Sequence, residues 1–229
     1  MINYYEKYNQ FYMAVDCIIF GFDNEELKIL LIKRDFEPCR GEWSLMGGFL
    51  SLEEDLDDAA QRILTELTGL KNVFLEQLYT YGEKGRDTAG RVISTAYYAL
   101  IKTEKYDETL LKKHHAAWFS LEKIPDLVFD HNRMVEKALK RLRRKSRIQP
   151  VGFELLPEKF TLPQLQKLYE AIHGEEFDKR NFRKKILSFG VLKKLDQKEK
   201  ETSRKGAFLY TFNRKKYESL VSEGNQLAF

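Results

Sequence analysis

The sequence predicts an α+β protein of two domains, residues 1–148 and residues 149–229. Apolar, β-branched runs recur through the first two thirds of the chain, as expected for the strands of a central sheet. One amphipathic helix interrupts these runs and is bracketed by glycines. The last third is basic and contains two short helical patterns followed by a hairpin pattern.

Length and composition set the outer limits. The 229 residues, 43% of them hydrophobic, suit one large or two small domains with ordinary cores. Two cysteines, Cys17 and Cys39, match neither a disulfide framework nor a metal spacing, and they suggest a reducing compartment, so we expect a cytoplasmic protein. Neither a signal-peptide pattern nor a run of about 18 apolar residues occurs, so no membrane contact is expected.

The first domain opens with a predicted hairpin. Residues 14–22 and 27–34 read as two strands joined by a turn at Asp23 and Asn24. Further strands are expected at residues 73–81, at 92–101 and around Trp118 and Phe119, and a long helix at residues 129–145. The chain begins with aromatic residues that we expect to pack on this sheet or on a second subunit: Tyr4, Tyr5, Tyr8, Phe11 and Tyr12.

Residues 52–68 are predicted to form the amphipathic helix. Ser51, followed by acidic residues, is the expected start, because carboxylates complement the unpaired amides of a first turn. Gly69 is the expected left-handed stop. The apolar stripe consists of Leu56, Ala59, Ala60, Ile63, Leu64 and Leu67.

The segment WSLMGGF at residues 43–49 and the stretch GFLSLEEDLDDAAQRILTELTGL at residues 48–70 resemble the Nudix box. The resemblance implies an α/β/α sandwich around a mixed sheet. Ile63 and Leu67 depart from the pattern, because they stand where the family has glutamates. The positions in register are Gly48, Glu54, Arg62, Leu64, Glu66, Gly69 and Leu70.

By this resemblance, an active enzyme would hold magnesium with glutamates at positions 63, 66 and 67. Only Glu66 remains, and one carboxylate is a poor site for a cation that demands several oxygen ligands. We therefore expect no catalytic residue, no metal and no cofactor, with Glu54 and Arg62 forming an ion pair. The alternative is an active pyrophosphatase for ADP-ribose-like nucleotides, using a displaced metal site around Glu54 and Glu66.

The run GRDTAGRVISTAYYALI at residues 85–101 resembles ADP-ribose pyrophosphatases and their regulatory relatives. Guanidinium groups suit phosphate or sugar oxygens, so this loop is expected to border a ligand pocket, although a polar hairpin loop would show the same residues. The candidate effector-binding residues are Arg34, Glu54, Glu66, Arg86, Asp87 and Arg91.

The second domain starts with two predicted helices. Thr161 caps the first, Pro163 lies in its first turn and Gly174 stops it. The second runs from its cap at Asp178 to about Phe189. One face of this second helix is apolar and the other polar, which suits a helix that reads base edges and phosphates. The candidate DNA-binding residues on it are Lys179, Arg180, Asn181, Arg183 and Lys184.

A hairpin of residues 191–196 and 208–213 is expected next, with a charged loop at residues 197–207 and a closing helix. Two helices and such a hairpin form a winged helix, with Arg204 and Lys205 as further candidate DNA contacts on the wing. Residues 151–229 carry 16 Lys+Arg against 11 Asp+Glu, a balance that suits nucleic acid but also a solvated surface.

The segments FTLPQLQKLYEAI and DKRNFRKKIL in this domain are similar to the carboxy-terminal domain of Nudix-related transcriptional regulators, the NrtR-like family. The resemblance implies a homodimeric repressor that binds a double-stranded DNA operator. Its effector would be a sugar or sugar phosphate, such as a pentose, or an ADP-ribose-like nucleotide, and its targets genes of sugar or NAD metabolism. A module that contacts protein instead of DNA is the remaining alternative.

Overall fold

The computed structural model describes residues 4–23, 26–71, 73–102, 108–200 and 206–223. It divides into two compact units, and the main division falls inside helix α3 (His131–Ile148), between Ala138 and Leu139. Within the described ranges, no helix is both long enough and apolar enough to cross a membrane.

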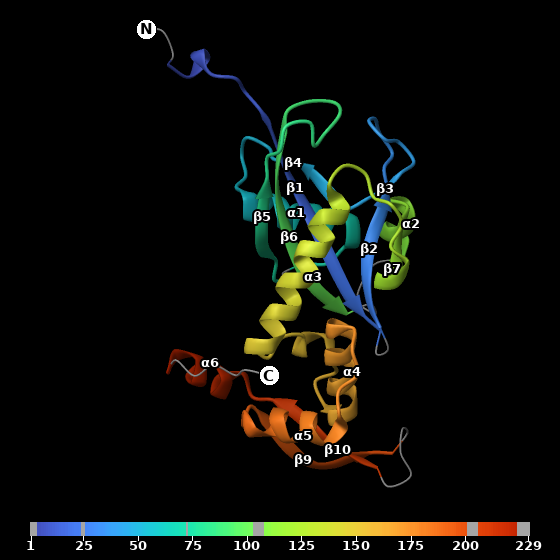
Figure 1. Cartoon of the computed structure of the whole chain (residues 1–229), viewed down its shortest axis with the longest axis vertical. Coiled ribbons are helices and arrows are strands. Elements are labelled where there is room, and N and C mark those ends of the chain that lie inside the picture. The colour runs from blue at the N-terminus through green and yellow to red at the C-terminus, as the bar shows by residue number, and fades with distance from the viewer. Residues whose placement is uncertain (1–3, 24–25, 72, 103–107, 201–205, 224–229) are drawn as a thin grey trace. The chain divides into compact units, whose positions relative to one another are not determined.

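A seven-stranded sheet forms the centre of the first unit. The central strands β1 and β6 run side by side in the same direction (Figure 1), and Tyr12 N–H donates to the carbonyl of Arg91 at their start, at 3.1 Å. The strand order is β3-β2-β1-β6-β5, with β4 on β1 and β7 on β2. The strands are β1 (Tyr12–Phe22), β2 (Leu27–Lys33), β3 (Trp43–Ser44), β4 (Met46–Phe49), β5 (Glu76–Tyr81), β6 (Val92–Lys102) and β7 (Ala116–Ser120).

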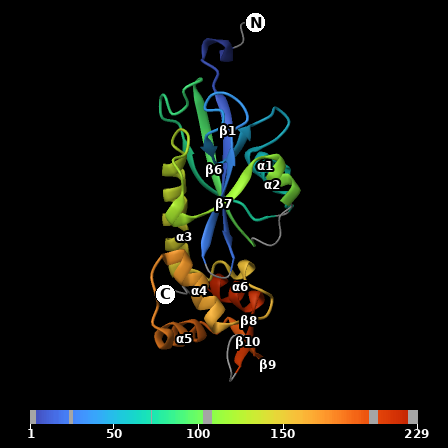
Figure 2. The same cartoon turned by 90° about the vertical axis from the view of Figure 1, so that its right-hand side faces the viewer.

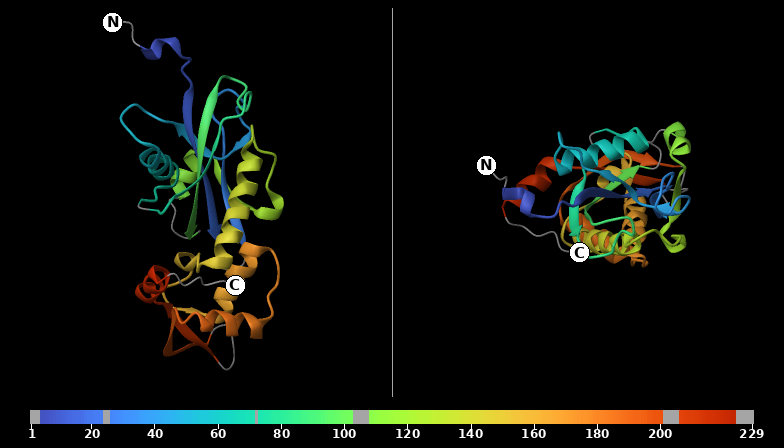
Figure 3. Two further views of the ribbon diagram at one scale, coloured as in Figure 1. Left: turned by 60° about the vertical axis from the view of Figure 1, so that its left-hand side comes forward. Right: turned by 90° about the horizontal axis from the view of Figure 1, so that it is seen from above.

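Helices cover both faces of this sheet. Helices α1 (Leu56–Thr68) and α2 (Glu108–Lys113) lie on one face, and the first half of α3 lies on the other (Figures 2 and 3). Two 3-10 turns, η1 (Tyr4–Lys7) and η2 (Leu121–Lys123), complete the unit. The predicted α/β/α sandwich with a mixed sheet is confirmed.

Helix α1, which belongs to the segment that resembles the Nudix box, begins later than predicted. Asp55, not Ser51, is the N-cap, and its carboxylate accepts from the backbone N–H groups of Asp57 and Asp58. Ser51 instead donates its backbone N–H to Glu54 Oε1 at 2.9 Å, which holds residues 51–54 in a loop. The predicted stop is confirmed, since Gly69 has a left-handed backbone with φ of 75°.

Other boundaries also differ. Strand β5 begins at Glu76 instead of residue 73, and α3 runs from His131 to Ile148 instead of residues 129–145. Phe129 has a positive φ of 56°, which breaks the helical geometry before His131.

The aromatic residues at the start of the chain were expected to pack on the sheet or on a second subunit, and those whose side chains are described are not buried on the sheet. Tyr8, Phe11 and Tyr12 are each more than half exposed, although the Tyr12 ring touches that of Phe49. Packing on a second subunit stays a prediction. The side chains of Tyr4 and Tyr5 lie outside the described part of the chain.

In its described residues, the second unit contains three short α-helices and a three-stranded sheet of order β8-β10-β9, with α4 packed on β8, β10 and α5 (Figure 1). Thr161 caps α4 in a capping box with Gln164, and Gly174 ends it, as predicted. Strand β9 extends to Glu199, so residues 197–199 belong to a strand and not to the predicted loop. The elements are η3 (Phe153–Leu155), β8 (Phe160–Thr161), α4 (Leu162–His173), α5 (Lys179–Ser188), β9 (Leu192–Glu199), β10 (Ala207–Phe212) and α6 (Arg214–Ser222).

Candidate functional site

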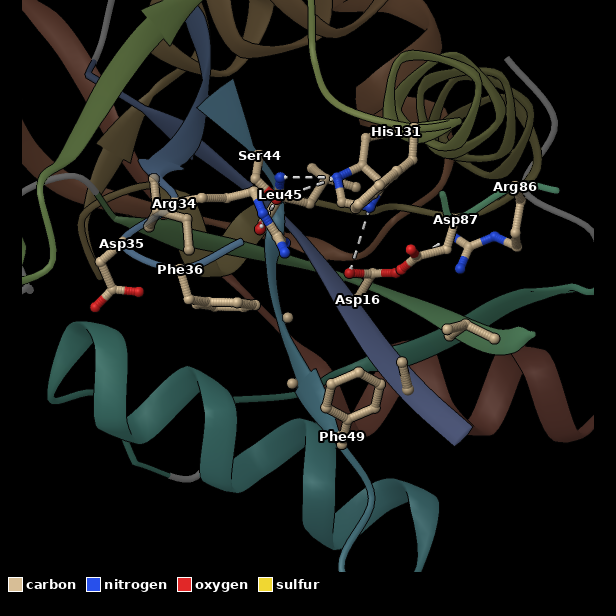
Figure 4. A pocket seen from close by; sticks show the side chains of 16 residues that line it. Asp16, Arg34, Asp35, Phe36, Ser44, Leu45, Phe49, Arg86, Asp87 and His131 are labelled. Atoms are coloured by element: carbon tan, nitrogen blue, oxygen red, sulfur yellow. Dashed lines mark hydrogen bonds and ion pairs between the residues drawn. The ribbon is translucent and has the colours of Figure 1, made fainter. Parts of the chain in front are cut away.

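A cleft lined by charged and apolar side chains opens in the first unit where β1, β4 and the start of α3 meet (Figure 4). It encloses about 630 Å³, its open mouth included. Strands supply its floor, and the loops after β2 and after β5 supply its rim. The polar and aromatic lining residues are Asp16, Arg34, Asp35, Phe36, Ser44, Phe49, Arg86, Asp87, Phe129 and His131.

Asp16 provides a buried carboxylate at the floor of this cleft. The residue is 6% exposed, and the hydroxyl of Ser94 donates to its Oδ2 atom at 2.6 Å. Gly47 lies opposite Asp16 on β4, and a Cβ atom there would come within 2.3 Å of Asp16 Oδ1. The glycine therefore leaves the space that this carboxylate occupies.

Arg86 is held inside the cleft wall by carboxylates. Its Nε and Nη2 atoms donate to Asp130 at 3.1 and 2.7 Å, and Nη2 also lies 3.7 Å from Asp16 Oδ2. A bidentate pair of this kind fixes the guanidinium plane. Only part of the Arg86 guanidinium thus remains to meet a ligand.

His131 is the first residue of α3, and its ring is almost fully buried. The backbone N–H of Leu45 donates to Nδ1 at 3.2 Å, so we assign the proton of the neutral ring to Nε2, which lies 3.7 Å from Asp16 Oδ1. Burial lowers the pKa of His131, against an opposing effect of Asp16. The ring is therefore neutral at pH 7 and presents an N–H group toward Asp16.

Arg34 lies at the rim between two aromatic rings. Its guanidinium is 4.2 Å from the ring centre of Phe36 and 5.2 Å from that of Phe129, and its Nε donates to Pro38 O at 2.8 Å. Its terminal nitrogens make no hydrogen bond or ion pair within the described residues. Arg34 is thus the better placed of the two arginines to meet an anionic group.

The lining charges sum to a slightly acidic cleft. Three carboxylates, of Asp16, Asp35 and Asp87, face two guanidinium groups, of Arg34 and Arg86, and Asp130 already neutralises one of these. Carboxylates accept hydrogen bonds from hydroxyl groups and repel phosphates. The cleft thus offers carboxylates that can accept hydrogen bonds from hydroxyl groups, together with Arg34 as a contact for an anionic group.

Three of the six candidate effector residues line the cleft, namely Arg34, Arg86 and Asp87. Glu54, Glu66 and Arg91 do not belong to its lining. The two glutamates meet Arg62 instead, at 2.6 and 3.5 Å, which confirms the predicted pair of Glu54 and Arg62. Arg91 donates to Glu83 O at 3.0 Å and stacks on Phe11.

The face of α1 that would hold a metal is largely apolar. Ile63 is 2% exposed, and its side chain lies beneath Gly48, where an added Cβ would be 3.3 Å from it. Glu66 is mostly solvent-exposed. Among the described residues, no group of three or more His, Cys, Asp or Glu is placed to hold a metal ion.

Helix α5 in the second unit presents the predicted polar face. Phe182 and Ile186 are buried, whereas the five candidate DNA-binding residues on this helix are all exposed. Asp178 caps the helix by accepting from Asn181 N–H at 2.8 Å. The two candidates on the wing, Arg204 and Lys205, lie outside the described residues.

The cleft contains residues that sequence reasoning did not select. Asp16 had a visible signal, because it is the only charged residue in the apolar run of residues 14–22. Phe36 and Phe49, each about half exposed at the cleft, had no signal of their own. His131 lies in the predicted helix of residues 129–145, but no local pattern gives it a role, since its partners are the distant residues Ser44 and Leu45.

A Nudix-type sandwich followed by a winged helix is the class of protein that this fold defines. Residues 11–138 match the model of the NUDIX domain, and residues 152–212 match that of the NrtR DNA-binding winged helix domain. The chain therefore belongs to the NrtR-like family of Nudix-related transcriptional regulators.

Similar proteins and structures support the assignment of both domains to this family. The "ADPR responsive transcriptional repressor NtrR" of Acinetobacter baylyi is 37% identical, over 90% of this chain and 84% of its own. A crystal structure of Shewanella oneidensis NrtR complexed with a 27mer DNA is 30% identical, with a TM-score of 0.79 over 90% of this chain and 95% of the other. The ADP-ribose pyrophosphatase of Methanocaldococcus jannaschii is 32% identical, over 56% of this chain and 73% of its own.

Proposed function

We propose that this protein is a transcriptional repressor that binds an operator as a homodimer and releases it when a pentose-containing effector binds the cleft. In this proposal residues 1–148 sense the effector and residues 149–229 bind DNA in the cytoplasm. One observation supports it most. A winged helix with an exposed cationic α5 is joined to a Nudix-type domain whose box lacks two of the three glutamates that would bind a metal.

The cleft supports a sugar as the recognised part of the effector. Asp16 can accept hydrogen bonds from hydroxyl groups, His131 Nε2 can donate to one, and the rings of Phe36 and Phe49 offer apolar faces. The relative from Acinetobacter baylyi responds to ADP-ribose, which contains a pentose beside its phosphates. A free pentose, a sugar phosphate and an ADP-ribose-like nucleotide all offer the hydroxyl groups of a pentose to this cleft. Genes of sugar or NAD metabolism are accordingly the proposed targets.

Catalytic inactivity is part of the proposal. Hydrolysis of a diphosphate in this family would need several oxygen ligands for magnesium, and Ile63 and Leu67 offer none. The carboxylate of Glu54 is engaged by Arg62, and the hydrogen bonds from Arg62 lower the pKa of Glu54 to about 2. Without a bound metal, the effector would bind to the cleft and dissociate from it without being hydrolysed.

Operator binding with and without effectors tests this function. The purified protein should bind the DNA upstream of its own gene or a neighbouring gene with nanomolar affinity, and one effector should weaken that binding. ADP-ribose, free pentoses and pentose phosphates are tested in parallel, so the responsive one identifies the source of the sugar. Failure of every duplex to bind specifically would contradict the proposal.

An active pyrophosphatase is the second candidate, supported by the relative from Methanocaldococcus jannaschii. Magnesium-dependent release of AMP from ADP-ribose, abolished by Glu66→Gln, would establish it. We expect no turnover in the wild-type protein, because one exposed glutamate on α1 cannot complete a magnesium site.

A further inference from the structure

A second cleft lies in the winged-helix unit, between the end of α3, the α4–α5 turn and one side of α5. It encloses about 1030 Å³, its open mouth included. Its lining residues are Arg147, His173, Glu175, Phe177, Asn181, Phe182, Lys184, Lys185 and Ser188.

Positive charge gathers around this cleft from two separate elements. Arg147 comes from the last turn of α3, and Lys184 and Lys185 come from α5, whereas Glu175 is the only carboxylate among the lining residues. Neither Arg147 nor Lys184 makes a hydrogen bond or ion pair to another described residue. These charges are thus available to a ligand.

The backbone that carries Arg147 is fixed to α4. Arg143 Nε donates to Ile172 O at 2.9 Å, and the hydroxyl of Ser146 lies 2.9 Å from His173 Nε2. Since that hydroxyl donates to Arg143 O, it accepts from the histidine ring. Two hydrogen bonds, made by Arg143 and Ser146, therefore hold the turn of α3 before Arg147 against the end of α4.

An apolar base lies beneath the charges. The rings of Phe177 and Phe182 stack with centres 5.9 Å apart, and Phe182 is 4% exposed. A low-dielectric base strengthens the attraction between nearby cations and an anion. Burial lowers the pKa of His173, and the positive charge of Arg147 lowers it further, so this ring adds no charge at pH 7.

The cleft adjoins the polar face of α5. Asn181, Lys184, Lys185 and Ser188 follow the helical spacing of one side, and Lys184 also belongs to the exposed face that carries Arg180. A duplex that places base edges against Arg180 brings its backbone alongside that face. A phosphodiester of the same duplex is therefore the anion nearest to this cleft.

We propose that this cleft binds a backbone phosphate of the operator, with Arg147 and Lys185 as phosphate contacts beside Lys184. The proposal rests on the proposed function. It adds a DNA contact from α3, the helix whose first residue, His131, lines the effector cleft. A phosphate contact positions the duplex and carries no sequence information.

The test measures the salt dependence of duplex binding by Arg147→Gln and Lys185→Gln. Losing one phosphate contact should reduce the slope of log affinity against log salt by about 0.9, which is roughly eightfold weaker binding at 0.1 M salt. The loss should be equal for the operator and an unrelated duplex. Arg144→Gln is the matched control, since Arg144 is exposed on the same helix but does not line the cleft.

An Arg147→Gln slope equal to that of Arg144→Gln would overturn the proposal, provided that the wild type binds its operator. Micromolar binding of inorganic phosphate that requires Arg147, with an unchanged DNA slope, would also overturn it and assign the cleft to a free phosphate. A wild-type protein that binds no duplex would overturn the proposed function and this contact with it. Thermal unfolding of each variant shows whether the fold is retained.

Discussion

Asp16 lies on β1 among core residues, and its carboxylate reaches the floor of the first cleft. A buried carboxylate requires partners, and here Ser94 donates a hydrogen bond while Arg86 and His131 lie 3.7 Å away. Gly47 completes the arrangement by having no side chain. The position of one acidic group thus depends on residues from three other segments of the chain, at residue 47, at residues 86–94 and at residue 131.

Gly47→Ala tests this packing. The new Cβ would lie 2.3 Å from Asp16 Oδ1 and 3.0 Å from Val15 O, so either the carboxylate or the strand must move. We expect a loss of about 1–3 kcal/mol in the free energy of unfolding, together with weaker effector binding. Denaturant unfolding and calorimetry measure the two effects. Gly90→Ala, whose Cβ would meet only the Tyr12 ring at 3.8 Å, should leave both unchanged.

His131 gives the first unit a pH dependence. Burial lowers its pKa in the folded protein below the ordinary value of 6.5. As the pH falls through 6.5, the unfolded chain binds a proton that the folded ring does not, so the free energy of unfolding decreases. His131→Gln can still accept from Leu45 N–H but cannot titrate. We therefore expect a smaller fall in melting temperature between pH 7.5 and pH 5.5 in this variant.

The matched control for that experiment is His114→Gln, since His114 does not line the cleft. It should keep the wild-type dependence on pH. Equal melting curves for His131→Gln and wild type across this range would show that the ring is not held neutral by the fold.

Helix α1 shows which parts of an element follow from local sequence. Its end was predicted because Gly69 provides a left-handed stop within the local sequence. The predicted start at Ser51 was wrong, because the acidic residues that follow it, Glu53, Glu54 and Asp55, compete for the capping position. The carboxylate of Glu54 accepts hydrogen bonds from Arg62, eight residues further on, so Asp55 caps the helix instead. The second unit was predicted more closely, because each end of α4 has its own local signal in Thr161 and Gly174.

The ion pair at the start of α1 should stabilise the protein above the acidic range. Hydrogen bonds from Arg62, and from Ser51 N–H, lower the pKa of Glu54 from 4.5 to about 2. This contribution is fully present above pH 4.5 and is lost as the pH falls toward 2. Glu54→Gln should therefore lower the melting temperature at pH 7, and the difference from wild type should shrink below pH 4.

Glu66→Gln is the control for this pair. Glu66 meets the same Arg62 at 3.5 Å but is mostly exposed, so its replacement should change the melting temperature at pH 7 by less. A Glu54→Gln protein as stable as wild type at pH 7 would show that the loop is held by its other contacts.

Both domains and the polar helix α5 could be predicted from the sequence, but only some of the residues that line the cleft could be. Arg34, Arg86 and Asp87 were selected by the chemistry of their side chains and do line it. Glu54 and Glu66 were selected by their place in the box and contact Arg62 instead. The contact between His131 and Leu45 depends on how α3 meets the sheet, and no pattern within either segment records it.

The proposed function requires that effector binding and DNA binding can be separated by mutation. Asp16→Asn removes the floor charge without changing the size of the side chain, so operator affinity should remain near wild type while the effector no longer weakens it. Arg180→Ala should do the opposite, weakening operator binding by about 1–3 kcal/mol while effector affinity is retained. Operator titrations with and without effector, and calorimetry without DNA, measure both.

Linkage adds a quantitative condition to this separation. If the effector weakens operator affinity by some factor in the wild type, the operator must weaken effector affinity by the same factor. In Asp16→Asn the factor for operator affinity should approach one, because a ligand that no longer distinguishes the two states cannot shift their populations. Measuring effector affinity with and without saturating operator gives this factor independently. Unequal factors in the wild type would show that the effector acts at more than the one cleft, or that it is altered during the measurement, as hydrolysis would alter it.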